Sequence, residues 1–100
     1  MSEIEGIRHL TEGYRTAELR EGEQFSVGEV YARYNPRERC DEPACDATVN
    51  TEGKTIKMEF IWDWHRNRVV RKDNNGTIRG DLLALVIAAV REKFRAAGHS

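Results

Sequence analysis

Two cysteines are the first candidates for chemistry in this sequence. Cys40 and Cys45 have four residues between them, a spacing that occurs in metal sites but is less typical of zinc than two. A tetrahedral zinc site would need further ligands, and His65 is one candidate. A small structural zinc-binding domain is therefore one alternative. Because the ligand set is incomplete, two ordinary thiols in a surface loop, with no cofactor, are the favoured interpretation.

An acid and an imidazole stand two residues apart at Asp63 and His65, and on a strand they would share one face. A carboxylate that orients an imidazole is the smallest unit of general-base catalysis. No serine or cysteine of the sequence stands in a glycine-flanked turn where such a base could activate it. We therefore expect no catalytic residues and no enzymatic activity.

Cations and aromatic rings gather in the segment 64–72. Beside Trp64 stand five residues that are candidate contacts to phosphates: His65, Arg66, Arg68, Arg71 and Lys72. Cations bind phosphates and rings stack on bases, so the segment is a candidate nucleic-acid interface. The sequence pI of about 6.3 is well below the value above about 9 that is typical of nucleic-acid-binding domains. Nucleic-acid binding is therefore an alternative rather than the leading interpretation.

Tryptophan, tyrosine and arginine also dominate the energetics of protein interfaces. The predicted contact residues of this kind are Trp64, Arg66, Arg68, Tyr31 and Tyr34, together with the charged segment 37–46. Their rings would anchor a protein partner and their charges would steer its approach. The leading interpretation is a small non-enzymatic protein-interaction module, an adaptor or inhibitor of the kind that bacteria and phages carry. This comparison is an analogy at the level of the fold.

The helices that must position these residues are predicted from capping patterns and apolar spacing. A Ser-x-x-Glu capping box begins a first helix over about 3–19, and a second box begins a short helix over about 26–34. Residues 37–46 show no periodicity and are expected to form a loop. Asp81 is placed as the N-cap of a long helix over 82–97.

The clearest strand signal lies at 54–64, where apolar and polar residues alternate with a period of two. Shorter strands are expected at 47–50 and 69–72, which would make a three-stranded antiparallel meander. The predicted fold is therefore one small α+β domain over residues 1–100. It has two N-terminal helices, this three-stranded sheet and the long C-terminal helix packed on the sheet.

The predicted C-terminal helix is almost entirely apolar over residues 82–90. An ordinary surface helix is apolar along one stripe, so this helix must be covered on more than one side. We expect the sheet to cover one side and the N-terminal helices to cover the other. A homodimer that uses this helix is the alternative.

The 100-residue chain has 16 Lys and Arg against 17 Asp and Glu, a formal net charge of −1. This balance hides a gradient, because residues 1–29 hold seven glutamates and three arginines, whereas residues 51–80 hold seven cations and four acids. No apolar stretch approaches the roughly 20 residues of a membrane helix, and the first residues show no secretory signal. We expect a cytoplasmic protein with no membrane contact.

Overall fold

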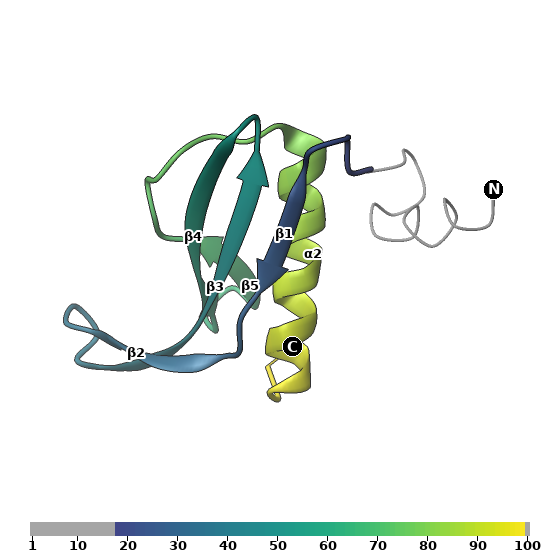
Figure 1. The fold of residues 1–100 in the computed structure, drawn as a ribbon. Helices are drawn as coiled ribbons and strands as arrows, with labels where there is room; N and C mark the ends of the chain where they lie inside the picture. The colour runs from purple at the N-terminus through teal and green to yellow at the C-terminus, as the bar shows by residue number, and fades with distance from the viewer. Residues whose placement is uncertain (1–17, 100) are drawn as a thin grey trace.

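The computed structural model describes residues 18–99, which form a curled antiparallel sheet with one helix across one face (Figure 1). The elements follow in chain order: β1 (Gln24–Val27), β2 (Tyr31–Asn35), β3 (Cys40–Thr51), β4 (Lys54–Asp63), β5 (Arg68–Arg71) and α2 (Gly80–Ala96). The described part of the chain is therefore mostly β structure.

The long strand β3 organises the sheet because three other strands pair with it. β4 runs along one of its edges, and β5 pairs with β4 in turn. β2 pairs with the first half of the other edge and β1 with the second half. Between these two short strands, the backbone N–H of Gly28 donates to the carbonyl of Asp46 at 2.9 Å. β1 and β2 are thus two pieces of one interrupted edge, and the β2–β3 hairpin extends beyond the helix (Figure 1).

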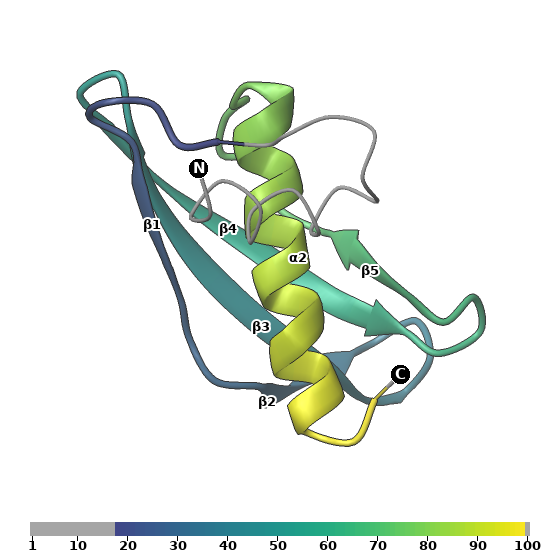
Figure 2. The ribbon, with the colours of Figure 1, turned by 90° about the vertical axis from the view of Figure 1, so that its right-hand side faces the viewer.

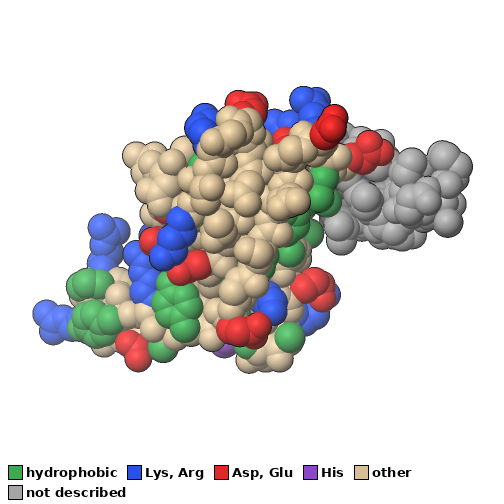
Figure 3. Space-filling model, in the orientation of Figure 1, with side chains coloured by type: hydrophobic (Ala, Val, Ile, Leu, Met, Phe, Trp, Pro, Cys, Tyr) green, Lys and Arg blue, Asp and Glu red, His purple; other side chains and the backbone are tan. Residues whose placement is uncertain are grey.

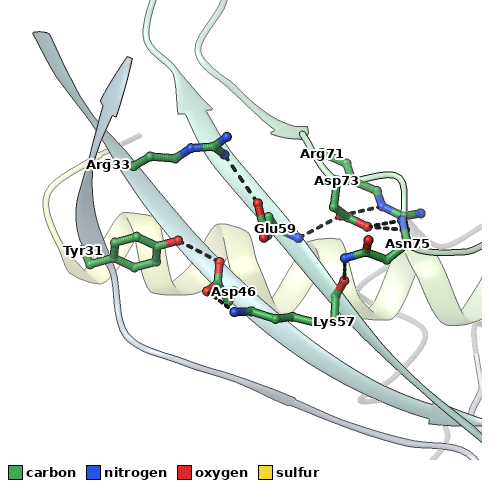
Figure 4. Close-up of polar contacts among 8 residues, drawn as sticks. All are labelled: Tyr31, Arg33, Asp46, Lys57, Glu59, Arg71, Asp73 and Asn75. Carbon is green, nitrogen blue, oxygen red and sulfur yellow. Dashed lines mark hydrogen bonds and ion pairs between the residues drawn. The ribbon is translucent and has the colours of Figure 1, made fainter. Parts of the chain in front are cut away.

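The two faces of the sheet differ in character. Helix α2 crosses one face (Figure 2), and the sheet residues beneath it are apolar and buried: Cys45, Ala47, Val49, Ile56, Met58, Phe60 and Trp62. The helix adds its own buried stripe: Leu82, Leu85, Val86, Val90 and Phe94. Burial of these side chains is the main source of stability. The opposite side of the sheet, which we call the open face, is largely polar and includes Tyr31, Arg33, Asp46, Lys57 and Glu59 (Figure 4).

The predicted second helix over 26–34 is wrong, because this segment ends β1 and forms β2. Valine and tyrosine are frequent in the segment, and β-branched and aromatic side chains favour extended structure. Glu29 of the supposed capping box instead makes an ion pair with Lys93, at 2.8 Å. Tyr31 and Tyr34 therefore extend from a strand, where a separation of three residues places them on opposite faces.

The predicted three-stranded sheet is also wrong, because five strands pair. Residues 40–46, which were expected in a loop, form the first half of β3, and residues 40–44 of this half pair with β2. This half extends beyond the helix, so that much of it stays partly exposed and its apolar alternation is weak. Pro43 is accommodated because it lies in this outlying half of the strand, near the edge of the sheet.

The C-terminal helix is confirmed, since the predicted 82–97 corresponds to α2. Its N-cap is Arg79, however, and Asp81 lies in the first turn. The strand predicted at 54–64 is confirmed as β4. Of the predicted first helix, residues 3–17 lie outside the described residues. Within residues 18–99, no helix is both long and apolar enough to cross a membrane.

Candidate functional site

Two hairpin turns meet at one end of the sheet (Figure 2). The β2–β3 turn spans residues 36–39 and the β4–β5 turn spans residues 64–67. Across the gap, His65 Nε2 lies 3.8 Å from Glu38 Oε1, and residues of both turns line one depression of about 460 Å³. We call this region the hairpin end and define it as residues 33–42, residues 61–68 and Lys72.

Asn35 holds the β2–β3 turn in place. Its side-chain oxygen accepts hydrogen bonds from the backbone N–H groups of Arg37, at 2.9 Å, and Glu38, at 3.3 Å. Its side-chain nitrogen donates to Glu42 Oε1 at 2.8 Å. Arg39 closes the turn with a left-handed φ of 56°. The side chains of Arg37 and Arg39 therefore extend from a hydrogen-bonded frame.

Asp63 holds the β4–β5 turn in a similar way. Its Oδ1 accepts hydrogen bonds from the backbone N–H groups of His65, at 3.0 Å, and Arg66, at 3.3 Å. The imidazole of His65 faces Glu38 instead of Asp63. The Asp63 carboxylate is therefore a turn-forming group here and does not orient the imidazole.

Two aromatic rings extend from the hairpin end into solvent. Tyr34 is 60% exposed and Trp64 is 58% exposed. The ring of Trp64 stacks on the imidazole of His65, with ring centroids 4.0 Å apart. Stacking restricts the orientation of the indole and leaves much of its surface open to a partner. Two of the three aromatic residues that the sequence singled out as contacts thus belong to the hairpin end.

The third aromatic residue, Tyr31, has different surroundings. Its hydroxyl donates to Asp46 Oδ1 at 2.9 Å, and Asp46 lies 3.6 Å from Lys57 Nζ on the open face (Figure 4). Burial, and after it the hydrogen bond to Asp46, raises the pKa of Tyr31. Tyr31 is therefore part of the open-face network and lies outside the hairpin end.

Cations from both turns gather at the hairpin end, which lies at the lower left of Figure 3. Among residues 18–99, no acid lies within ion-pair distance of Arg37, Arg39 or Arg68. Arg66 makes a loose contact of 3.8 Å with Asp63. These four arginines come from two segments that are far apart in the sequence, and β3 and β4 bring them to one end.

Arg71, which the sequence placed in the same basic cluster, is engaged elsewhere (Figure 4). Its guanidinium donates to both carboxylate oxygens of Asp73, at 2.9 and 2.7 Å, and to the carbonyl of Gly76 at 2.7 Å. The arginine holds the pKa of the Asp73 carboxyl well below its usual range. Lys72, the next residue in the sequence, lines a depression at the hairpin end, and Arg71 does not.

A second depression, of about 370 Å³, adjoins the first. Its lining includes three cations, from β2, from the β2–β3 turn and from the residue after β5: Arg33, Arg37 and Lys72. The sequence interpretation missed Arg33, because it assigned this residue to a helix. It named Arg37 as a contact only within the charged segment 37–46, which it expected to be a loop. The available signal was the Asn-Pro pair at 35–36, which marks a turn between them.

The structure does not bring the two cysteines together. Cys40 is exposed at the start of β3, whereas Cys45 is buried opposite Phe60. Five steps along a strand separate their Cα atoms by roughly 17 Å and place them on opposite faces. Cys45 Sγ donates to the Gly28 carbonyl, and burial raises the pKa of its thiol, which disfavours the thiolate that a metal requires. His65 lies on the other hairpin, and no three His, Cys, Asp or Glu side chains of residues 18–99 are placed to hold a metal.

The acids that precede β2 do not neutralise these cations in the described part of the chain. Glu23 pairs with Arg79 at 2.6 Å, next to the start of α2. Glu29 pairs with Lys93 at 2.8 Å, near the end of α2. Within residues 18–99, Glu23 and Glu29 therefore pair with cations that lie outside the hairpin end.

The side of α2 next to β1 is apolar. A depression of about 420 Å³ separates helix and strand, and its apolar lining consists of Phe25, Leu85, Ala88 and Ala89. The sequence predicts that the first helix covers this side of α2, but residues 3–17 of that predicted helix lie outside the described range. Homodimerisation through this helix stays a prediction.

No family model, curated protein or solved structure matches the chain. The functional interpretation therefore depends on the geometry and charge of the hairpin end.

Proposed function

We propose that the chain is a non-enzymatic cytoplasmic module, without a cofactor, that binds a protein partner through the hairpin end. The observation that supports this proposal is the placement of Tyr34 and Trp64, both more than half exposed, beside arginines from two turns. Aromatic rings and arginines supply most of the binding free energy in typical protein interfaces. Both turns are fixed by side-chain hydrogen bonds, so little backbone conformational entropy would be lost on binding.

The alternation of charge at the hairpin end favours a protein over a nucleic acid. Glu38, Glu42 and Asp63 line the same depression as Arg37 and Arg66. A phosphate backbone is bound best by a continuous row of cations. A protein surface, in contrast, can present both signs of charge in a complementary arrangement.

Affinity capture tests this proposal. The immobilised chain is incubated with a nuclease-treated lysate of the organism that encodes it, and the retained proteins are quantified by mass spectrometry. We expect Trp64→Ala and Arg66→Ala each to lose a partner that the wild-type chain retains, with unchanged melting temperature. Lys54→Ala, an exposed change at the opposite end of β4, is the matched control and should retain it. Retention by both hairpin-end variants would place the interface elsewhere.

Single-stranded nucleic acid is the second candidate, and the exposed arginines favour it. Arg37, Arg39 and Arg68 have no ion-pair partner within residues 18–99, and a base could stack on the neighbouring Trp64. If this candidate is right, a gel shift should weaken steeply between about 50 and 200 mM salt. The double variant R66E/R68E should abolish the shift. A flat salt response would rule this candidate out.

Self-association is a separate proposal about partners, and the apolar depression between β1 and α2 supports it. Light scattering after size-exclusion chromatography should then give twice the chain mass of 11.5 kDa. A monomeric mass at all concentrations would exclude a homodimer.

A further inference from the structure

The depression beside Lys72 has an excess of positive charge. Arg33 reaches it from β2 and Arg37 from the following turn. The acid in its lining, Glu42, accepts a hydrogen bond from Asn35 and so is partly engaged. Three cations therefore surround a volume of about 370 Å³, which is large enough for an acidic side chain.

Within residues 18–99, the guanidinium of Arg33 is only loosely paired. The carboxylate it faces is that of Glu59, whose Oε1 lies 3.8 Å from Nη1, beyond hydrogen-bonding distance (Figure 4). This Nη1 is buried and has no hydrogen-bond partner within residues 18–99. A buried donor without an acceptor is costly in free energy. Arg33 lines the depression and Glu59 does not, so an oxyanion in the depression would meet an arginine whose charge is only loosely paired within residues 18–99.

The backbone around the depression is held in register. Arg33 lies opposite Glu42 in the β2–β3 ladder. The N–H of Lys72 donates to the carbonyl of Glu59 at 2.7 Å. The N–H of Arg37 donates to the Asn35 side chain. The backbone positions from which the three cations extend are therefore fixed before any ligand arrives, which reduces the entropy lost on binding.

We infer that this depression is an anion site that receives a carboxylate from an acidic segment of the protein partner. The inference rests on the proposed function and names the chemistry that its interface recognises. The planar fork of Arg33 matches a carboxylate through two parallel hydrogen bonds. Tyr34 and Pro36 also line the depression and offer apolar contact to the residue beside the acid. Glu38 and Asp63 in the adjoining depression would repel a continuing chain of phosphates.

A titration followed by NMR tests the inference with a blocked hexaglutamate peptide as the probe. We expect saturable shifts of the Arg33 Nε–Hε resonance and of the backbone amides of Tyr34 and Lys72. The Arg33→Gln variant should bind the peptide roughly tenfold more weakly, the usual effect of losing a charged hydrogen bond. Arg91→Gln removes an exposed arginine of α2, outside the hairpin end, and it should bind as the wild-type chain does.

Each other outcome overturns the inference. Absence of shifts at Arg33, or an equal loss in Arg91→Gln, would show that no specific site exists. Lys72→Gln provides a second variant if Arg33→Gln fails to fold, and it should also weaken binding. A hexathymidine oligonucleotide that binds more tightly than the peptide through the same residues would assign the depression to nucleic acid.

The affinity capture distinguishes this inference from the proposed function. If Arg33→Gln retains a partner that Trp64→Ala loses, the hairpin end is the interface and the anion site is wrong. If Trp64→Ala and Arg66→Ala both retain every partner, the proposed function is wrong, whatever the peptide titration shows.

Discussion

Arginines in two regions of this molecule have opposite surroundings. In the segment 71–79, which leads into α2, both arginines are fully engaged. Arg71 donates to the carboxylate of Asp73, and Arg79 donates to both carboxylate oxygens of Glu23, at 2.6 and 3.0 Å. Arg79 also donates to the backbone carbonyl of Glu18. At the hairpin end, in contrast, Arg37 has no ion-pair partner within residues 18–99.

This difference in pairing distinguishes arginines that stabilise the fold from arginines that are available to bind a partner. Breaking a bidentate pair that is shielded from water destabilises the fold, because removing one partner leaves the other charge poorly solvated. The Asp73 side chain is only 3% exposed, so it belongs to this class. An exposed arginine without a partner contributes little to folding. The molecule therefore keeps its structural arginines near the start of α2 and its available arginines at the hairpin end.

Removal of Asp73 is expected to have the largest effect on stability among these changes. Asp73→Ala leaves the Arg71 guanidinium without its carboxylate and the backbone N–H groups of Glu59 and Asn75 without their acceptor. We expect a loss of about 2–3 kcal/mol in the free energy of unfolding, measured in urea. Asp41→Ala, at an exposed position of the hairpin end, is the control and should change it little. Equal losses would contradict the division between the two regions.

The Glu23–Arg79 pair predicts a dependence of stability on pH. The hydrogen bonds from Arg79, followed by the bond from the Arg20 backbone, lower the pKa of Glu23 from 4.5 to about 2. A carboxyl whose pKa is lower in the folded state stabilises the fold fully above its unfolded pKa. That contribution is lost as the pH falls from 4.5 towards about 2.

Urea midpoints measured across this pH window check the prediction. The wild-type chain should lose stability steeply, and Glu23→Gln should give a flatter profile because its side chain does not titrate. Glu52→Gln, in the exposed β3–β4 turn, should keep the wild-type slope. Asp73 contributes in the same direction, since its pKa is also lowered, so some slope will persist in Glu23→Gln. An identical slope in Glu23→Gln and wild type would show that the pair is not formed.

Sequence periodicity predicted the elements whose pattern is local. β4 alternates because α2 covers one of its faces, and α2 is apolar because it packs on the sheet. The segment 26–34 was misassigned because a Ser-x-x-Glu box and apolar residues three or four apart also occur by chance in two short strands. The connection at Gly28 interrupts the alternation of apolar and polar residues along β1 and β2. Neither strand is long enough to show a period of two by itself.

The candidate site was predicted in part for the same physical reason. Trp64 and Arg66 are neighbours in the sequence, so their proximity needed no knowledge of the fold. Arg33 and Arg37 join them through the pairing of β3 with both β2 and β4, a relation between distant segments that no local pattern encodes. The aromatic contact at Tyr34 was predicted on a helix, and it reaches the same surface from a strand.

The smallest expected effect provides the sharpest test of the comparison between the two regions. Arg37→Gln combined with Arg39→Gln should change the free energy of unfolding by less than about 0.5 kcal/mol, because neither side chain has an ionic partner among residues 18–99. Arg79→Gln makes the same chemical change beside α2 and should lower stability clearly, since it breaks the contacts to Glu23. If the double variant proves as unstable as Arg79→Gln, the arginines of the β2–β3 turn are structural. They would then be unavailable to a partner, and the interface would have to depend on Trp64 and the β4–β5 turn.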